Sequence, residues 1–217
     1  AEYCVMEVSS HSLALDRVYG IHFECSIFTN LTRDHLDFHK TFENYYAAKF
    51  KLFERSSIKL INIDDTYGMQ VLKDCEKINS ENLYSFSLKN DSDYKAYDEV
   101  MGSRNIKFKL KLDKEEEFVI EIPGEYNVYN ALGAIGVCYK LGIPVESIKK
   151  GIEDTVVPGR CERVGKEYNL PYEIIIDYAH TPDGLENILT TAKVFTKGKL
   201  IAIFGCGGDR DKVKRPQ

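Results

Sequence analysis

A chain of 217 residues, 43% of them hydrophobic and 29% charged, has the composition of a soluble globular protein with one large domain or two small ones. Its net charge of −5 argues against nucleic acid as the main partner, and no apolar run approaches the roughly 18 residues of a membrane span. The six cysteines form no CxxC pair, and the first residues lack the pattern of a signal peptide. We therefore expect a cytoplasmic protein that binds neither nucleic acid nor membrane.

Short apolar segments alternate with helical patterns in the first part of the chain. The sequence predicts strands at 3–8, 25–31 and 59–64, a helix at 41–56 that begins after Thr41 as its N-cap, and a short helix at 66–75. This β-α-β-α order is typical of a parallel sheet with helices on its faces.

The pattern changes between residues 81 and 122, where successive strands show alternating polarity. We expect them to form an antiparallel ribbon or small sheet inserted in the α/β unit. The expected strands are 81–88, 94–101, 105–112 and 117–122. Two helices follow, at 127–142 and 144–154, and the first of them ends at a glycine.

A Pro-Gly pair at 158–159 marks the expected linker, so we predict one domain at 1–158 and a second at 159–217. The second domain restarts the β-α-β order with a strand near 172–177, a helix at 185–195 and a strand near 199–204. These residues are too few to complete a doubly wound sheet, so we expect Gln217 to be an internal point of a longer protein.

Lys49 occupies an unusual place in the predicted helix 41–56, because its neighbours three and four residues away are aromatic or apolar. These neighbours are Tyr45, Tyr46, Leu52 and Phe53. Two interpretations are open: the lysine stem covers apolar surface while its ammonium reaches water, or partial burial lowers its pKa and frees the amine for chemistry. A neutral lysine amine also takes up carbon dioxide as a carbamate, which turns a cation into an anion.

Glu7 and His35 both come at the ends of predicted strands, so they would reach the same edge of a parallel sheet, where ligands bind. A carboxylate and an imidazole there are suitable ligands for Mg²⁺ or Mn²⁺ beside phosphates. The alternative is an exposed Glu7 that precedes a helix cap at Ser9 or Ser10. His39, four residues after His35, is interpreted as an ordinary surface histidine.

Two motifs of the second domain have polar residues after a strand. "DYAHTPD" (177–183) places Asp177 and His180 before a helix, and "FGCGGDRD" (204–211) is a glycine-rich turn. Backbone N–H groups of such a turn can approach phosphate, although a plain tight turn explains the pattern equally well. The chain contains no GxxxxGK[ST] motif of a P-loop.

Seven segments together resemble, in this order and spacing, the Mur ligase family, and within it the MurE type most. They are "EVSSHSLALDRV", "FTNLTRDHLDFH", "YYAAKFKLF", "PGEYNVYNALGAI", "PGRCERV", "DYAHTPD" and "FGCGGDRDKVKRP". The resemblance covers nearly the whole chain and is weakest at 65–118. It implies an α/β fold: a central ATP-binding domain, with a parallel sheet flanked by helices and a small antiparallel sheet, followed by the first part of a Rossmann-like C-terminal domain.

The activity that the resemblance implies is an ATP-dependent amide-bond ligase of peptidoglycan synthesis. ATP would phosphorylate the terminal carboxylate of UDP-MurNAc-L-Ala-D-Glu, and the amino group of a diamino acid, such as meso-diaminopimelate or L-lysine, would displace the phosphate. Charge develops on the transferred phosphoryl group, which explains the need for Mg²⁺ and fixed cations. We expect the protein to be a monomer.

The matching motifs also imply roles for individual residues. Glu7 and His35 would be Mg²⁺ ligands, and Lys49 would be a carbamylated lysine that supports a second Mg²⁺, which makes His35 and Lys49 the expected catalytic residues. The expected substrate-binding residues are Ser9, Arg17 and Arg210. The expected ATP-binding residues are Asn130, Arg160, Asp177 and His180.

Ligases of this family also contain a UDP-binding domain, a P-loop and the remainder of the C-terminal domain, none of which these 217 residues include. We therefore expect the isolated chain to be inactive. Two alternatives remain open. One is a ligase similar to folylpolyglutamate synthase, against which the "EVSSH" and "GCGGDRDKVKRP" segments argue. The other is a binding module that keeps the fold without the P-loop.

Overall fold

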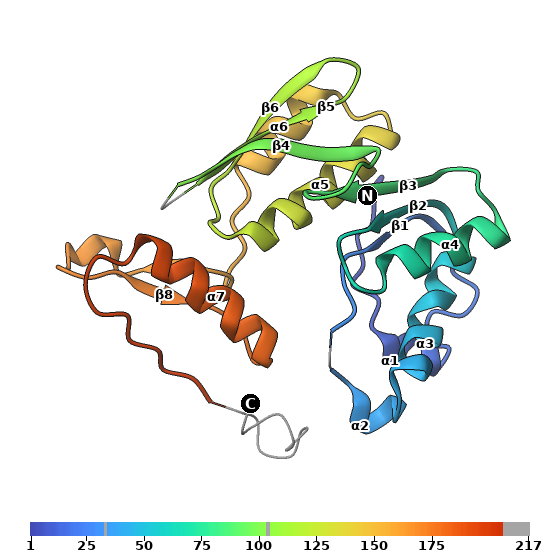
Figure 1. Ribbon diagram of the computed structural model, residues 1–217, viewed down its shortest axis with the longest axis horizontal. Coiled ribbons are helices and arrows are strands. Elements are labelled where there is room, and N and C mark those ends of the chain that lie inside the picture. The colour runs from blue at the N-terminus through green and yellow to red at the C-terminus, as the bar shows by residue number, and fades with distance from the viewer. Residues whose placement is uncertain (33, 103–104, 206–217) are drawn as a thin grey trace. The chain divides into compact units, whose positions relative to one another are not determined.

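The computed structural model describes residues 1–32, 34–102 and 105–205 (Figure 1). The chain divides into two compact units, Ala1–Asp93 and Tyr94–Gln217, and each is described by itself. Among the described helices, none combines the length and the apolar character that a membrane span requires. The predicted domain boundary at residue 158 stays a prediction.

The first unit is built on a three-stranded parallel sheet. Its strands are β1 (Phe23–Phe28), β2 (Ser56–Asn62) and β3 (Leu83–Ser87), and β2 pairs in parallel with both neighbours. The helices α3 (Phe42–Glu54) and α4 (Gly68–Ile78) connect consecutive strands and pack against the sheet (Figure 1). The predicted β-α-β-α order of this region is therefore confirmed.

The core of the first unit lies between these helices and the sheet. Its buried residues are Phe28, Leu31, Tyr45, Phe53, Ile61, Ile63, Val71 and Cys75. Thr41 caps α3 as predicted, because its side-chain oxygen accepts a hydrogen bond from the Asn44 N–H at 3.2 Å. Burial of one face of α3 against β1 and β2 thus fixes the direction in which the helix presents Lys49.

Two strand predictions for the first unit are wrong. Residues 3–8 form no strand, and Val5 is 99% exposed, because no described residue pairs with this segment and an unpaired strand leaves its backbone groups unsatisfied. The strand at 81–88 exists as β3, but it runs parallel to β2 and not antiparallel as expected. The helix α4 accounts for this, because a helical crossover returns the chain to the same end of the sheet.

The second unit begins with an antiparallel sheet of three strands, as predicted. They are β4 (Tyr94–Met101), β5 (Ile106–Lys111) and β6 (Glu115–Ile120). Alternate residues of β5 and β6 are buried, since one face of the sheet is covered by α5 (Glu125–Lys140) and α6 (Val145–Glu153).

The remaining elements of the second unit are shorter. A two-stranded antiparallel pair, β7 (Glu162–Val164) and β8 (Ile174–Ile176), encloses a 3₁₀ turn at Lys166–Tyr168, and α7 (Pro182–Phe195) follows. The strand predicted near 199–204 is not formed, and Ile203 is 96% exposed. Among the described residues this segment has no strand partner, so its apolar pattern alone does not make it a strand.

Two other short helices lie in the first unit, α1 (Ser10–Ala14) and α2 (Leu36–His39).

Asp64, just after β2, organises the turn that follows β3. Its Oδ1 accepts hydrogen bonds from the Ser87 hydroxyl (2.6 Å) and the Asn90 amide (2.7 Å), and its Oδ2 accepts from the N–H groups of Leu88 and Lys89. Burial by itself raises the pKa of Asp64, but these hydrogen bonds together lower it to about 2.

The low pKa of Asp64 gives a prediction for stability against pH. A carboxyl group with a depressed folded-state pKa stabilises the protein above its unfolded pKa of 3.8, and this contribution is lost as the pH falls towards about 2. We expect Asp64→Asn to lower the free energy of unfolding by roughly 1–2 kcal/mol at pH 7 and to remove much of the acid-side decline. Urea unfolding between pH 3 and 7 measures both. Asp91→Asn, an exposed carboxylate of the same loop, is the control; equal pH profiles for the two variants would contradict the prediction.

Gly68, the first residue of α4, gives a second prediction. A Cβ atom at this position would lie 1.8 Å from the carbonyl oxygen of Asn62 in β2. Because that oxygen belongs to the backbone, Gly68→Ala must displace the helix from the sheet, and we expect a loss of about 2–3 kcal/mol of stability. Gly151→Ala in α6, where a Cβ meets no atom within 4 Å, should instead be neutral or slightly stabilising. Thermal and urea unfolding of the two variants test this; equal stabilities would refute it.

Candidate functional site

His35 follows β1 and begins α2 in a left-handed backbone conformation, with φ 55° and ψ 19°. Its N–H donates to Asp34 Oδ1 at 2.9 Å, and its ring Nε2 lies 3.4 Å from Asp34 Oδ2. Burial lowers the pKa of His35, and the charge of Asp34 opposes this in part. The imidazole is therefore largely neutral at pH 7, which is the form that binds a metal ion.

Lys49 is half-buried on α3. Its ammonium donates a hydrogen bond to the carbonyl oxygen of Asn30 at 3.1 Å and lies 5.5 Å from the centre of the Tyr45 ring. Burial lowers the pKa of Lys49, while the negative charges of Asp65, Asp34 and Glu7 raise it, in that order. Three carboxylates thus act on one half-buried ammonium group, which faces the loop after β1.

Tyr45 links the two residues predicted to be catalytic. Its ring lies against that of His35, with ring centres 6.2 Å apart and an interplanar angle of 86°, and beneath the Lys49 ammonium. The side chain is 5% exposed, and burial raises the pKa of its hydroxyl to about 12. The structure therefore brings His35 and Lys49 together beside the buried ring of Tyr45. Glu7 acts on this cluster from the exposed segment before α1, not from the predicted strand end.

The side chains around Lys49 include oxygen and nitrogen atoms that could bind a divalent cation. Among the described residues, no three His, Cys, Asp or Glu side chains converge in a way that could hold a metal by themselves. Mg²⁺ commonly takes one or two protein ligands and completes its shell with water and phosphate oxygens. The imidazole of His35 together with one carboxylate, from Asp34, Asp65 or Glu7, fits such a partial ligand set.

Ser9 and Arg17, the predicted substrate-binding residues of this unit, flank α1. Ser9 is the N-cap of α1, and its side-chain oxygen accepts a hydrogen bond from the Ser12 N–H at 3.1 Å. The cap named in the alternative interpretation is therefore present, and the Ser9 hydroxyl also shares a 2.9 Å hydrogen bond with the Ser12 hydroxyl. Arg17 is exposed beyond the end of α1.

His39 is not a surface histidine, and that interpretation is wrong. The residue is 6% exposed, its Nε2 shares a 2.8 Å hydrogen bond with the Ser10 hydroxyl, and its ring stacks on Tyr45 with centres 5.1 Å apart. Burial lowers the pKa of His39, and the nearby rings of His11 and His35 lower it further. The helix α2 is a single turn, so no periodicity in the sequence revealed which of its residues face inward.

Two residues of this region were missed by the sequence reasoning, one near Lys49 and one near His35. Asp65 follows β2 and accepts a hydrogen bond from the Leu31 N–H at 3.3 Å, beside the loop that carries His35. The rule that selected His35, a polar residue at the end of a parallel strand, would also have selected Asp65. His11, whose ring centre is 4.7 Å from that of His35, lies in a short helix and gave no such signal.

In the second unit, Asp177 follows β8 and uses both carboxylate oxygens on backbone N–H groups. Oδ2 accepts from Cys161 and Oδ1 from Ala179, each at 2.8 Å. The guanidinium of Arg160 is thereby held next to the turn after β8, because Arg160 directly precedes Cys161. Two of the predicted ATP-binding residues are thus brought together through backbone contacts.

Arg160 and His180, two of the predicted ATP-binding residues, both contact the ring of Tyr178. This exposed ring lies 4.9 Å from the guanidinium carbon of Arg160 and 4.9 Å, centre to centre, from the ring of His180.

Asn130 belongs to α5, where its side-chain amide donates to Asn127 at 3.2 Å. Burial raises the pKa of Tyr126, in the first turn of α5, to about 12, and the charge of Asp177 adds to this. The start of α5 is therefore close to the cluster. Arg210 lies outside the described residues.

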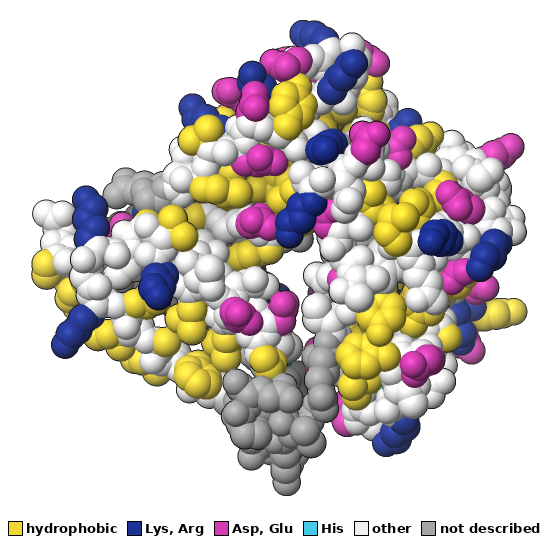
Figure 2. Space-filling model, in the orientation of Figure 1, with side chains coloured by type: hydrophobic (Ala, Val, Ile, Leu, Met, Phe, Trp, Pro, Cys, Tyr) yellow, Lys and Arg dark blue, Asp and Glu magenta, His cyan; other side chains and the backbone are white. Residues whose placement is uncertain are grey.

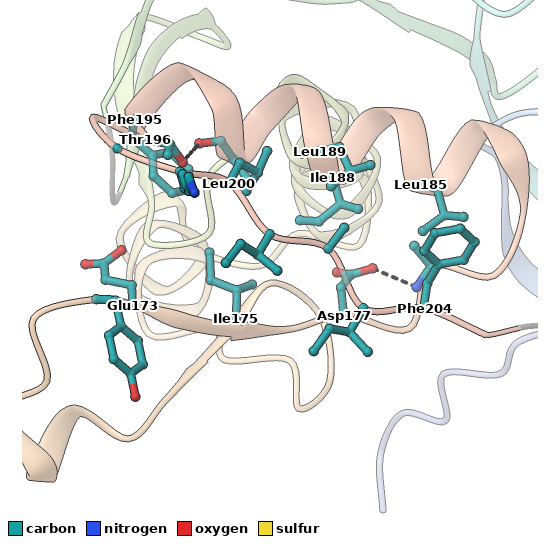
Figure 3. A pocket seen from close by; sticks show the side chains of 18 of the residues that line it. Glu173, Ile175, Asp177, Leu185, Ile188, Leu189, Phe195, Thr196, Leu200 and Phe204 are labelled. Carbon is teal, nitrogen blue, oxygen red and sulfur yellow. Dashed lines mark hydrogen bonds between the residues drawn. The ribbon is translucent and has the colours of Figure 1, made fainter.

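Asp177 and His180 also line a cavity of about 1200 Å³. Figure 3 shows side chains of α7, among them Leu185, Ile188 and Leu189, on one side of it and Ile175 of β8 on the other. The segment at 199–205 closes it in part, and Figure 2 shows hydrophobic side chains exposed on this part of the surface. The cavity thus has a mixed lining, in which the apolar side chains of α7 and β8 lie beside polar and charged residues such as Asp177.

Comparison with known proteins gives consistent matches over both units. Residues 1–138 match the family described as the Mur ligase middle domain, and residues 159–217 match the family described as the Mur ligase, glutamate ligase domain. A curated protein of Clostridium perfringens (strain 13 / Type A), named UDP-N-acetylmuramoyl-L-alanyl-D-glutamate–2,6-diaminopimelate ligase, is 65% identical over 217 residues. These residues are 100% of this chain and 45% of the relative, so the chain spans less than half the length of that protein.

Solved structures agree. A structure with the same ligase name superposes with a TM-score of 0.75 at 31% identity, over 96% of this chain and 43% of that one. A solved structure titled "FPGS-AMPPCP-folate complex" has a TM-score of 0.69 at 18% identity, over 83% of this chain and 44% of that one. The latter likeness shows a shared fold alone.

The bonds of Asp177 give a prediction for this site. An asparagine in its place keeps one acceptor oxygen and replaces the other with an NH₂ group, which cannot accept the second N–H. We expect Asp177→Asn to speed hydrogen exchange at the Cys161 or Ala179 amide by roughly fivefold or more, equivalent to about 1 kcal/mol. Asp154→Asn at the end of α6 is the control and should leave both amides unchanged. Unchanged exchange in Asp177→Asn would show that these bonds contribute little to the turn.

Proposed function

The chain belongs to the Mur ligase family, and on this premise we propose that it forms the central part of an ATP-dependent ligase that joins a diamino acid to UDP-MurNAc-L-Ala-D-Glu. The name of the 65% identical relative supports 2,6-diaminopimelate as the amino acid. The observation that carries the proposal is the cluster of His35, Lys49 and three carboxylates around Tyr45, because phosphoryl transfer requires such a charged site.

The reaction places several negative charges together, since a carboxylate must approach the γ-phosphate of ATP. Mg²⁺, when bound, would neutralise part of this charge and polarise the transferred phosphoryl group. His35 and Glu7 would hold it, with Asp34 fixing the orientation of the imidazole through the contact at 3.4 Å. The amine would then attack the carbonyl carbon of the acyl phosphate, the C–O bond to phosphate would break, and phosphate would leave as the new amide bond forms.

Lys49 would act as a carbamate. The ammonium would first lose one proton; the neutral amine would then attack carbon dioxide, an N–C bond would form as one C=O π bond opens, and a second proton would be released, so that the side chain changes from a cation to an anion. The burial that lowers the pKa of Lys49 favours the neutral amine, whereas Asp65, Asp34 and Glu7 favour the ammonium. A carbamate among these carboxylates needs a compensating cation, so we infer that modification of Lys49 and binding of Mg²⁺ support one another.

The second unit would bind the nucleotide. The Arg160 guanidinium and the exposed Tyr178 ring offer a flat cationic and aromatic surface, which suits a purine base or a phosphate. His180 borders this surface, Asp177 holds its backbone, and Asn130 would approach the adenine from α5.

The remaining substrate contacts are proposed on the family motifs. Ser9 and Arg17 at the two ends of α1 would hold the UDP-muramoyl peptide, and Arg210 would meet the incoming amino acid. The substrates are water-soluble precursors, which supports a cytoplasmic location, and we propose a monomer. A ligase similar to folylpolyglutamate synthase is not favoured, because that likeness is limited to the fold.

Replacement of Lys49 tests the proposed chemistry in the full-length ligase. We expect Lys49→Ala to lower the rate of product formation from UDP-MurNAc-L-Ala-D-Glu, ATP and diaminopimelate by roughly 100-fold or more, because carbamate oxygens are lost from the metal site. Short carboxylic acids such as acetate should restore part of the rate, since they supply a carboxylate in the space that the side chain leaves.

Lys51→Ala is the matched control, because Lys51 lies on the same helix but donates to the Leu13 carbonyl and faces Asp16. It should retain the rate within about twofold, as exposed ion pairs contribute little. Normal turnover of Lys49→Ala would refute the carbamate. Absence of diaminopimelate-dependent ligation in the unmodified full-length protein would refute the proposed function and favour a binding module.

A further inference from the structure

His39 is buried among groups that belong to three different elements. It ends α2, its Nε2 shares a 2.8 Å hydrogen bond with the hydroxyl of Ser10 in α1, and its ring stacks on Tyr45 of α3 at an interplanar angle of 17°. Ser10 is 2% exposed, so water does not compete for its hydroxyl. Because both partners are buried, removal of either leaves the other with an unsatisfied polar group.

The backbone of His39 connects this anchor to His35. The N–H groups of Phe38 and His39 both donate to the carbonyl oxygen of His35, at 3.1 and 2.9 Å, and the carbonyl of His39 accepts from the side chain of Asn44 at 3.0 Å. The single turn of α2 is thus bound at one end to His35 and at the other end to α1 and to the start of α3.

His35 needs such support, because its left-handed backbone conformation is unfavourable for a residue with a side chain. A conformation of this kind persists where the surrounding structure determines it strongly. No side chain caps α2 at His35. Besides the hydrogen bond of its own N–H to Asp34, the two backbone bonds from the turn and the anchor at His39 help to hold it. Tyr45, on which His39 stacks, also contacts His35 and the Lys49 ammonium.

We propose that His39 is a positioning residue, which fixes the α2 turn against α1 through Ser10 and so sets the orientation of His35 beside Lys49. The proposal rests on the proposed function only for its effect on Mg²⁺, since the effect on His35 is a property of this chain. His39 is not itself offered as a metal ligand, because its Nε2 is engaged by Ser10 and its ring is enclosed.

The most direct test removes the partner and not the histidine. Ser10→Ala breaks the hydrogen bond without altering any ring near His35. Ser57→Ala is the matched control, because Ser57 shares a hydrogen bond of the same 2.8 Å length with His22 at an exposed site. The chain contains only five histidines, so NMR spectra with labelled histidine resolve each of them.

We expect Ser10→Ala to move the Cα and carbonyl carbon shifts of His35 away from left-handed values and to displace its ring nitrogen signals, while Ser57→Ala affects His22 alone. Unchanged His35 signals in Ser10→Ala would overturn the proposal. If Ser10→Ala does not fold, His39→Gln replaces it, because the glutamine amide can keep the bond to Ser10 but not the stacking; a fully native His35 spectrum in that variant would then overturn the contribution of the ring.

A second readout uses the full-length ligase. Residues that orient a metal ligand typically affect metal affinity by 10–100-fold, so Ser10→Ala and His39→Phe should raise the Mg²⁺ concentration for half-maximal rate by about tenfold or more. The rate at saturating Mg²⁺ should change far less, the double variant should be no worse than His39→Phe, and His39→Gln should recover part of the loss in Mg²⁺ dependence.

A uniform fall in rate with unchanged Mg²⁺ dependence would show that His39 is merely structural and would overturn the proposal. If the unmodified full-length protein shows no ligation, the proposed function fails, yet a displaced His35 spectrum in Ser10→Ala would still establish the positioning of His35. The two failures are therefore distinguishable.

Discussion

The parallel pairing of β1 with β2 is the constraint on which the first unit depends. It directs the carboxyl ends of both strands to the same edge of the sheet, so that the loops after them meet. Two hydrogen bonds join these loops: the Asn62 amide donates to the Thr29 carbonyl at 2.8 Å, and the Leu31 N–H donates to Asp65 at 3.3 Å. Asp34, His35 and Asp65 are close to Lys49 for this reason, although they come from separate parts of the sequence.

The charge on Lys49 follows from a balance between two opposing effects of that arrangement. Removal from water disfavours the ammonium, whereas Asp65, Asp34 and Glu7 favour it. With the ammonium present, the cluster has a local cation among its anions. In the proposed carbamate form, the same carboxylates would repel the Lys49 side chain, and an added cation would restore the balance. On this proposal, binding of the metal ion and modification of the lysine would depend on each other.

The sequence was sufficient where local chemistry decides the structure. Thr41 was recognised as a cap because the residue type and its place before an amphipathic run are local properties. The predictions of a strand at 3–8 and of the direction of β3 failed, because pairing depends on which strands are available as neighbours and on the crossover between them. In the site, His35 and Lys49 came from motif and spacing, whereas the burial of His39 depends on how one helical turn folds back onto Ser10.

In the second unit, too, one residue supports the backbone while other residues are available to contact a ligand. Both carboxylate oxygens of Asp177 are engaged by backbone N–H groups, from Cys161 and Ala179. In the proposed nucleotide site, its main effect is therefore to hold the turn, and with it Arg160, in place. The groups that remain free to meet a ligand are the guanidinium of Arg160 and the exposed ring of Tyr178. His39 and Asp177 thus make corresponding contacts in the two units, because each supports the backbone next to a residue with a proposed role in the site, His35 in the first and Arg160 in the second.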